Sequence, residues 1–118
     1  MGTNDNLELD YVQLINENNK GIFIISKENC PLCDKLKQLF ETINIEYSIY
    51  KYQETNNEKN NNFPFKTEMK NCTGGIMFPF CYFNGEYVGS YKHVHQNLIT
   101  GKLQKQLNQI GLEYEEDF

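Results

Sequence analysis

Three amino acids are missing from this chain of 118 residues, which has no alanine, no arginine and no tryptophan. Asparagine occurs 16 times instead, and lysine supplies all 11 positive charges. An excess of Asn, Ile, Lys, Tyr and Phe without Ala and Arg is typical of a coding bias toward A and T. The composition therefore says more about the genome than about the chemistry of the protein.

Long apolar runs are absent as well. The longest are about four residues, as at Ile22–Ile25, whereas a helix that spans a bilayer needs about 20. The first six residues lack the basic and apolar regions of a secretory signal. We therefore expect no membrane partner and a reducing, cytoplasmic location.

Positive charge is scarce and scattered. The lysines face 16 acidic residues, for a net charge of -5, and pairs such as Lys35/Lys37 lie among acids. This pattern argues against a nucleic-acid partner, which requires a basic stripe. The apolar fraction of 39% is sufficient for one core. We expect a monomer with a single domain over residues 1–112 and an acidic tail over residues 113–118.

Hydrophobic patterns predict the secondary structure. We expect a helix over residues 5–19 capped by Asp5, a strand over Ile22–Ser26 buried on both faces, and a helix that begins at Pro31. A second strand covers residues 45–52. Residues 53–71 form an irregular Asn-rich insertion, with a short helix left open as an alternative because Pro64 disfavours a regular helix.

The strongest local signal is an Asn84-Gly85 turn between two strand-like segments, residues 80–83 and 86–89, which predicts a tight hairpin. Helices over residues 92–99 and 102–110 follow. A strand–helix–strand unit implies a parallel pair, and the hairpin adds antiparallel strands. The sequence thus predicts an α/β fold with a mixed four-stranded sheet flanked by helices on both faces.

Two of the four cysteines form the motif Cys30-Pro31-Leu32-Cys33, between the buried strand and the next helix. A cysteine at a helix N-terminus has its thiolate favoured by unpaired backbone N–H groups and by the helix dipole. We predict that Cys30 is the nucleophile and that Cys33, one turn inward, resolves the mixed disulfide. Lys27 adds a cation on the same rim.

A zinc site is the alternative use of such a pair. It would require two more ligands, but Cys72, Cys81, His93 and His95 supply no second Cys-x-x-Cys or His pair at a suitable spacing. We therefore expect no bound metal. We interpret Cys81 as a buried apolar residue, Cys72 as incidental, and both histidines as surface residues.

The chain resembles the glutaredoxin family in three segments: Lys27-x-x-Cys30-Pro31-Leu32-Cys33, Phe78 to Ser90, and Gly101-Lys102-Leu103. The resemblance covers about residues 7 to 112. It implies a thioredoxin-like fold and a glutathione-dependent thiol–disulfide oxidoreductase, with glutathione as cosubstrate and Cys30 and Cys33 as the catalytic pair.

The resemblance also implies a glutathione-binding site. Pro79 matches a proline that follows a cis peptide bond and packs against the cysteines, and the backbone of Phe78 would pair with the cysteinyl part of glutathione. Lys27 would meet a glutathione carboxylate. Gly89 and Ser90 match the turn that holds the γ-glutamyl carboxylate.

Two positions depart from the family pattern. Leu32 borders the groove where most members have Tyr, and Lys92 stands where an Asp usually faces the γ-glutamyl amine. A redoxin fed by thioredoxin reductase, without glutathione, is therefore an alternative. So is a carrier of an iron–sulfur (2Fe–2S) cluster, although Pro31 disfavours it by resemblance, and so is a binding module with a vestigial pair. The expected client is a disulfide-containing protein such as ribonucleotide reductase.

Overall fold

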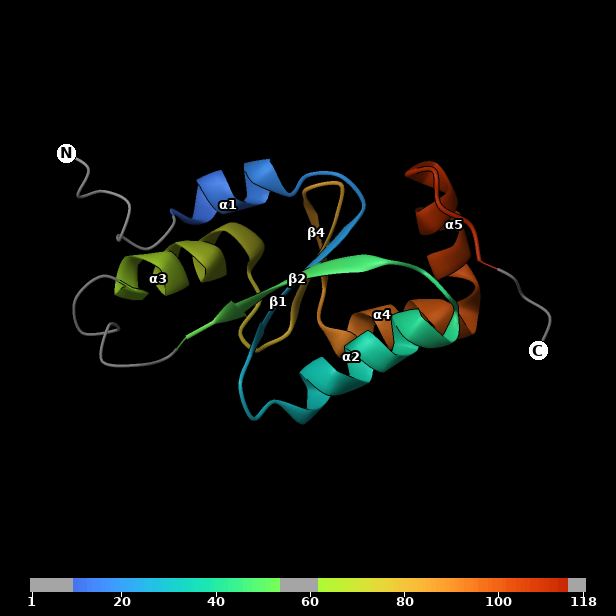
Figure 1. The fold of residues 1–118 in the computed structure, drawn as a ribbon, viewed down its shortest axis with the longest axis horizontal. Helices are drawn as coiled ribbons and strands as arrows, with labels where there is room; N and C mark the ends of the chain where they lie inside the picture. Colours follow the sequence, from blue (N-terminus) through green and yellow to red (C-terminus); the bar gives the residue numbers. More distant parts are fainter. Residues whose placement is uncertain (1–9, 54–61, 115–118) are drawn as a thin grey trace.

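A computed structural model of the chain describes residues 10–53 and 62–114 (Figure 1). The described residues form five helices and four strands. In chain order they are α1 (Tyr11–Glu17), β1 (Ile22–Lys27), α2 (Pro31–Thr42), β2 (Tyr47–Tyr52), α3 (Asn62–Thr73), β3 (Phe80–Phe83), β4 (Glu86–Gly89), α4 (Tyr91–Thr100) and α5 (Lys102–Gln109).

The four strands form one mixed sheet in the order β2-β1-β3-β4. β1 pairs in parallel with β2 and antiparallel with β3, and β3 pairs antiparallel with β4. Asn84 and Gly85 of the β3–β4 turn both have positive φ, as a tight hairpin of this kind requires. The predicted central strand, hairpin and mixed four-stranded sheet are confirmed.

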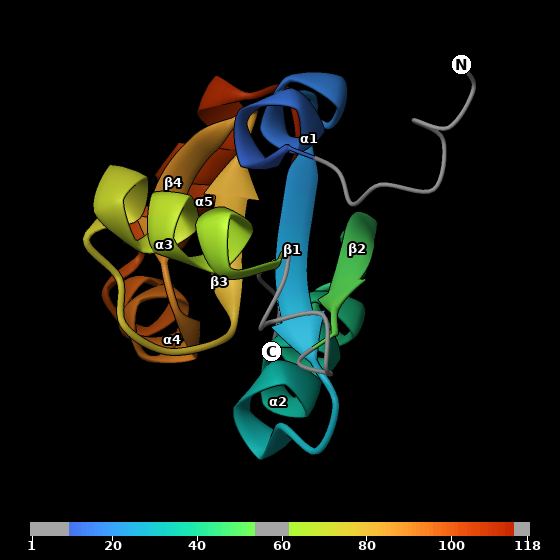
Figure 2. The ribbon, with the colours of Figure 1, turned by 90° about the vertical axis from the view of Figure 1, so that its left-hand side faces the viewer.

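Each face of the sheet carries its own hydrophobic core. Because side chains alternate along a strand, Ile22 and Ile24 of β1 pack with α2, α4 and α5, whereas Phe23 and Ile25 pack with α1 and α3. Figure 2 shows α1 at the top of the view and α2 at the bottom, with β1 running between them. Helices therefore flank both faces, as predicted. Tyr114, in the predicted acidic tail, is buried against the first core.

The first helix begins later than the predicted range of residues 5–19. Asp10 is the N-cap of α1, and its side chain accepts a hydrogen bond from the backbone N–H of Gln13 at 3.3 Å. A carboxylate at this position satisfies an N–H that has no partner within the helix. Asp5, the predicted cap, lies outside the described residues.

The segment predicted as an irregular insertion over residues 53–71 is helical from Asn62 onward, while residues 54–61 lie outside the described part. Pro64 is the third residue of α3. The first four backbone N–H groups of a helix have no intrahelical acceptor, so the proline at this position costs no hydrogen bond. Phe65, the next residue, and Met69, one turn after it, are buried and pack α3 onto the sheet.

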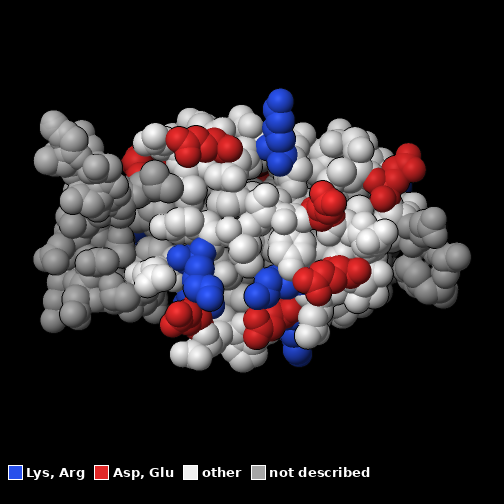
Figure 3. Space-filling model, in the orientation of Figure 1, with Lys and Arg blue, Asp and Glu red and all other residues white. Residues whose placement is uncertain are grey.

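Charged side chains of both signs are interspersed on the face that Figure 3 shows, with lysines next to acids. Over residues 10–53 and 62–114, no helix combines the length and the apolar character needed to cross a bilayer.

Candidate active site

The start of α2 brings the cysteine pair together. Cys30 is the N-cap residue with extended backbone angles, Pro31 is the first helical residue, and Cys33 follows within the first turn. The two cysteines form a disulfide, with Cα atoms 5.2 Å apart. The Sγ of Cys30 accepts a hydrogen bond from the backbone N–H of Cys33 at 3.2 Å. The helix N-terminus therefore directs a donor at this sulfur, which is the arrangement that stabilises a thiolate.

The two cysteines differ in exposure. Cys30 is half-buried, whereas Cys33 is 2% exposed and belongs to the core between the sheet and helices α1 and α3. An external disulfide can reach the sulfur of Cys30 but not that of Cys33. This asymmetry matches the roles that the sequence predicts for the two thiols.

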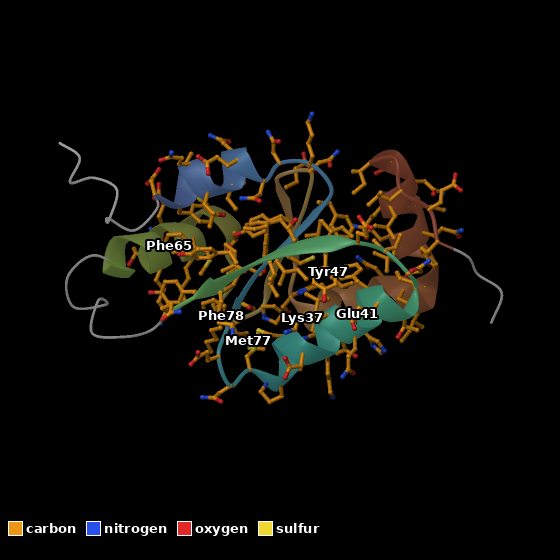
Figure 4. The ribbon with its side chains drawn as sticks, in the orientation of Figure 1. Lys37, Glu41, Tyr47, Phe65, Met77 and Phe78 are labelled. Atoms are coloured by element: carbon orange, nitrogen blue, oxygen red, sulfur yellow. A yellow bond between two sulfur atoms is a disulfide. The ribbon has the colours of Figure 1, made fainter. Side chains whose placement is uncertain are left out.

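Three of the predicted binding residues are connected through Phe78. The Phe78–Pro79 peptide bond is cis, and Phe78 packs in the same core as Cys33. The Nζ of Lys27, at the end of β1, lies 5.3 Å from the centroid of the Phe78 ring, within the range of a cation–π contact. Figure 4 labels Phe78 and its exposed neighbour Met77 on the segment that leads into β3.

The predicted turn at Gly89 and Ser90 forms the entry to α4. Gly89 has φ +127°, and a Cβ at this position would lie 2.5 Å from the Cβ of His93. Ser90 is the N-cap of α4, and its backbone N–H donates to Nδ1 of His93 at 3.1 Å. Nδ1 must be the unprotonated nitrogen of the ring in order to accept this bond.

His93 is therefore part of this turn, although sequence reasoning treated it as a surface residue. Its side chain is exposed, but it completes a reciprocal capping box with Ser90. The signal that could have revealed this role is the spacing Ser90-x-x-His93, three residues from N-cap to capping partner. Lys92, beside it in the first turn of α4, is exposed.

The remaining two cysteines, Cys72 and Cys81, are not part of this disulfide. Cys81 in β3 is fully buried, and burial raises the pKa of its thiol, so it stays protonated and unreactive. Cys72 in α3 is a free, exposed cysteine. Among the described residues, no group of three or more His, Cys, Asp and Glu side chains could hold a metal ion.

The fold and the site define a class of protein: a four-stranded α/β domain with a disulfide-bonded cysteine pair at the start of its first long helix. The glutaredoxin family model matches residues 22–88, so the chain belongs to the glutaredoxin family, a family of thiol–disulfide oxidoreductases. The chain is 29% identical over 112 residues to the mitochondrial glutaredoxin-2 of Pongo abelii, an alignment that covers 92% of this chain. It spans 66% of the length of that relative.

Solved glutaredoxins share the fold. The buckwheat glutaredoxin–glutathione complex is 22% identical with a TM-score of 0.70, and the alignment covers 86% of this chain and 87% of that one. Oxidised glutaredoxin 2 from Chlamydomonas reinhardtii is 24% identical with a TM-score of 0.67, over 87% and 98% of the two chains. These structures confirm the thioredoxin-like fold. The roles of the individual site residues stay predictions.

Proposed function

We propose that the protein is a glutathione-dependent thiol–disulfide oxidoreductase that reduces protein disulfides or glutathione mixed disulfides through Cys30 and Cys33. The observation that carries this proposal is the position of Cys30, half-buried at the N-terminus of α2 within disulfide distance of the buried Cys33. Membership of the glutaredoxin family supports the same chemistry.

The reaction proceeds by successive thiol–disulfide exchanges. The Cys30 thiolate attacks one sulfur of the client disulfide, which forms a mixed disulfide and releases the other client sulfur as a thiolate that takes up a proton. Cys33 loses its proton and attacks the Cys30 sulfur, which releases the client as a dithiol and leaves the Cys30–Cys33 disulfide. Two glutathione molecules then reduce this disulfide and become glutathione disulfide. Backbone N–H groups of α2 stabilise the anionic sulfur at Cys30.

The proposed glutathione site combines the residues around the disulfide with the entry to α4. Lys27 would meet one carboxylate, the backbone of Phe78 would pair with the cysteinyl part, and Leu32 and Pro79 would border the groove. Gly89 and Ser90 would hold the γ-glutamyl carboxylate, because a helix N-terminus favours an anion. The buckwheat relative was solved as a glutathione complex.

Lys92 gives the strongest reason to test a second reductant. It is exposed in the first turn of α4, where its charge attracts the γ-glutamyl carboxylate but repels the neighbouring ammonium group. Thioredoxin reductase is therefore the competing source of electrons.

We further propose a monomer that acts in the cytoplasm on a client such as ribonucleotide reductase. Because the Pongo abelii relative is a mitochondrial protein by name, fractionation of the source cells should test the location.

The test is a steady-state assay with a small glutathione mixed disulfide, run in parallel with glutathione plus glutathione reductase and with thioredoxin reductase. We expect turnover with glutathione. Cys30→Ser should abolish it, whereas Cys33→Ser should abolish reduction of protein disulfides and keep deglutathionylation. Cys72→Ser, the exposed cysteine on α3, is the matched control and should behave like the wild type. Residual glutathione-dependent activity in Cys30→Ser would show that the nucleophile is wrongly assigned.

A further inference from the structure

A hollow with a volume of about 360 Å³ lies between α2 and α4. Its volume falls in the usual range of small-molecule sites, roughly 300–1,000 Å³. It shares no lining residue with the proposed glutathione site, and it lies on the face of the sheet opposite α1 and α3. The residues that decide its chemistry are Lys35 and Leu39 of α2, Ile43 just after the end of that helix, and Tyr91, His95 and Leu98 of α4.

The inner part of the hollow is apolar. Leu39 and Ile43 are 8% and 5% exposed and belong to the core, and Leu98 packs against that core half-buried. These side chains leave apolar surface that a ligand could cover. A hydrocarbon chain or an aromatic ring of a small molecule would gain free energy there by leaving water.

The rim of the hollow is cationic and aromatic. The Nζ of Lys35 lies 6.0 Å from the centroid of the Tyr91 ring. The Tyr91 ring in turn stacks on that of His95, with centroids 5.4 Å apart and planes inclined by 23°. Lys35 thus stands directly above an aromatic wall of the hollow.

Among the residues that the structure describes, no acidic side chain lines the hollow, although the chain as a whole has a net charge of -5. The acids on α2 are engaged elsewhere. Asp34 pairs with Lys37 at 3.5 Å, and Glu41 accepts a hydrogen bond from the Tyr47 hydroxyl at 2.6 Å. Figure 4 shows Lys37 and Glu41 on α2 with Tyr47 of β2 beside them. The charge of Lys35 is therefore directed to the hollow without a competing carboxylate in its wall.

We propose that this hollow binds a small organic anion with an apolar body. The carboxylate or other anionic group meets Lys35 at the rim, and the apolar body covers Leu39, Ile43 and Leu98. This site is separate from the cysteine pair, so the proposal stands or falls independently of the oxidoreductase activity.

The test compares three probes with one aromatic body and different charge: phenylacetate, phenylethanol and phenylethylamine. Each is titrated into the full-length protein and followed by amide nuclear magnetic resonance. We expect phenylacetate to shift the amide signals of the α2 and α4 residues that line the hollow and to saturate. Phenylethanol should bind about three- to fivefold more weakly, since one exposed ion pair contributes a factor of this size, and phenylethylamine should bind more weakly still.

Lys35→Gln should reduce the affinity for phenylacetate to that for phenylethanol. Lys105→Gln, a substitution of the same kind at an exposed lysine of α5 that does not line the hollow, is the matched control and should leave the affinity unchanged. The amide spectrum of each variant reports directly whether its fold is intact. Equal binding of the acid and the alcohol, shifts outside the hollow, an absence of saturation, or unchanged affinity in Lys35→Gln would each overturn the proposal.

Discussion

Tyr47 is the first residue of β2, and one short hydrogen bond connects its side chain to the end of α2. Its hydroxyl donates to Oε2 of Glu41 at 2.6 Å, and its ring lies against Phe40 at a centroid distance of 6.2 Å. Partial burial, and then the hydrogen bond and negative charge of Glu41, raise the pKa of Tyr47 to about 12, from a reference value of 10.0. A single side chain thus makes the stability of this junction depend on pH.

The sign of this dependence follows from the direction of the shift. A group whose pKa is higher in the folded protein stabilises the fold below its unfolded pKa and loses that contribution as the pH rises through the folded value. The stability due to Tyr47 should therefore be full below pH 10.0 and be lost as the pH approaches about 12.

Tyr47→Phe tests this linkage. The substitution should lower the free energy of unfolding by about 0.5–1.5 kcal/mol at neutral pH, the usual contribution of one hydrogen bond. It should also flatten the loss of stability above pH 10.0. Urea unfolding at several pH values measures both effects. Glu41→Gln keeps an acceptor without the charge, so it should retain more of the neutral-pH stability than Tyr47→Phe. An equally steep alkaline loss in Tyr47→Phe would assign that loss to other groups.

The roles of some single residues can be predicted from the sequence. Cys30 and Cys33 could be placed because proline after a cysteine marks a helix start, and this local rule needs no tertiary information. The sequence does not reveal the contact between His93 and Ser90, because histidine is an uncommon capping partner. The His93 ring also fits against the backbone only because residue 89 is a glycine with positive φ and has no Cβ. The hydrogen bond between the hydroxyls of Tyr11 and Tyr82, at 2.9 Å, joins residues 71 positions apart and has no sequence signal at all.

Among the secondary-structure elements, the start of α2 carries the cysteine pair, and the start of α4 is the element that bears most on the proposed binding of glutathione. Ser90 and His93 fix its first turn, and the same turn is proposed to hold the γ-glutamyl carboxylate. The helix ends at Thr100. Gly101, with a φ of +86°, is both the C-cap of α4 and the N-cap of α5. The position of the proposed binding turn therefore depends on a contact between Ser90 and His93, a residue that is not itself among the predicted binding residues.

His93→Ala should loosen this turn. Loss of a cap costs about 0.5–2 kcal/mol, and we expect a higher KM for the glutathione mixed disulfide with a smaller change in kcat, because the cysteine pair is untouched. Thermal unfolding and steady-state kinetics measure the two effects. His93→Gln restores an acceptor of the kind found in capping boxes and should recover both quantities. His95→Ala, on the same helix but without the contact to Ser90, should leave the KM unchanged; if it raises the KM equally, the capping contact is not the cause.

The elements themselves were predictable where the pattern was local. An unbroken apolar run identified β1, and Asn84-Gly85 identified the hairpin. The start of α1 was placed too early because both Asp5 and Asp10 are suitable caps, and the sequence pattern does not choose between them. The sequence does not decide between a helix and a loop for α3, because Pro64 disfavours a helix unless its position within the first turn is known.

At the scale of the whole molecule, two cores share one sheet. Met69 of α3 and Leu107 of α5 are fully buried, one in each core. Because β1 contributes side chains to both cores, neither can be lost while the other stays packed. We therefore expect both faces to unfold in one cooperative transition.

Met69→Ala and Leu107→Ala test this coupling from the two sides. Each should lower the free energy of unfolding by about 2–5 kcal/mol, the usual cost of such truncations in a core. Far-ultraviolet circular dichroism and tyrosine fluorescence should give the same midpoint in urea, and the eight tyrosines are the natural reporters because tryptophan is absent. Ile99→Ala, at a side chain that is 66% exposed, is the control and should change stability by less than about 0.5 kcal/mol. Separate midpoints for the two probes would contradict the shared-core interpretation.

Side chains of β1 alternate between the two cores, and this alternation limits which mutations the strand can tolerate. Ile24 and Ile25 are both fully buried, but they face opposite cores. Inserting or deleting one residue within this strand would move every following side chain to the other face, so that the wider Phe23 site and the narrower Ile24 site would exchange occupants. Among descendants of this protein, substitutions that preserve size should therefore accumulate in β1, whereas changes of length should be confined to the loops at its ends.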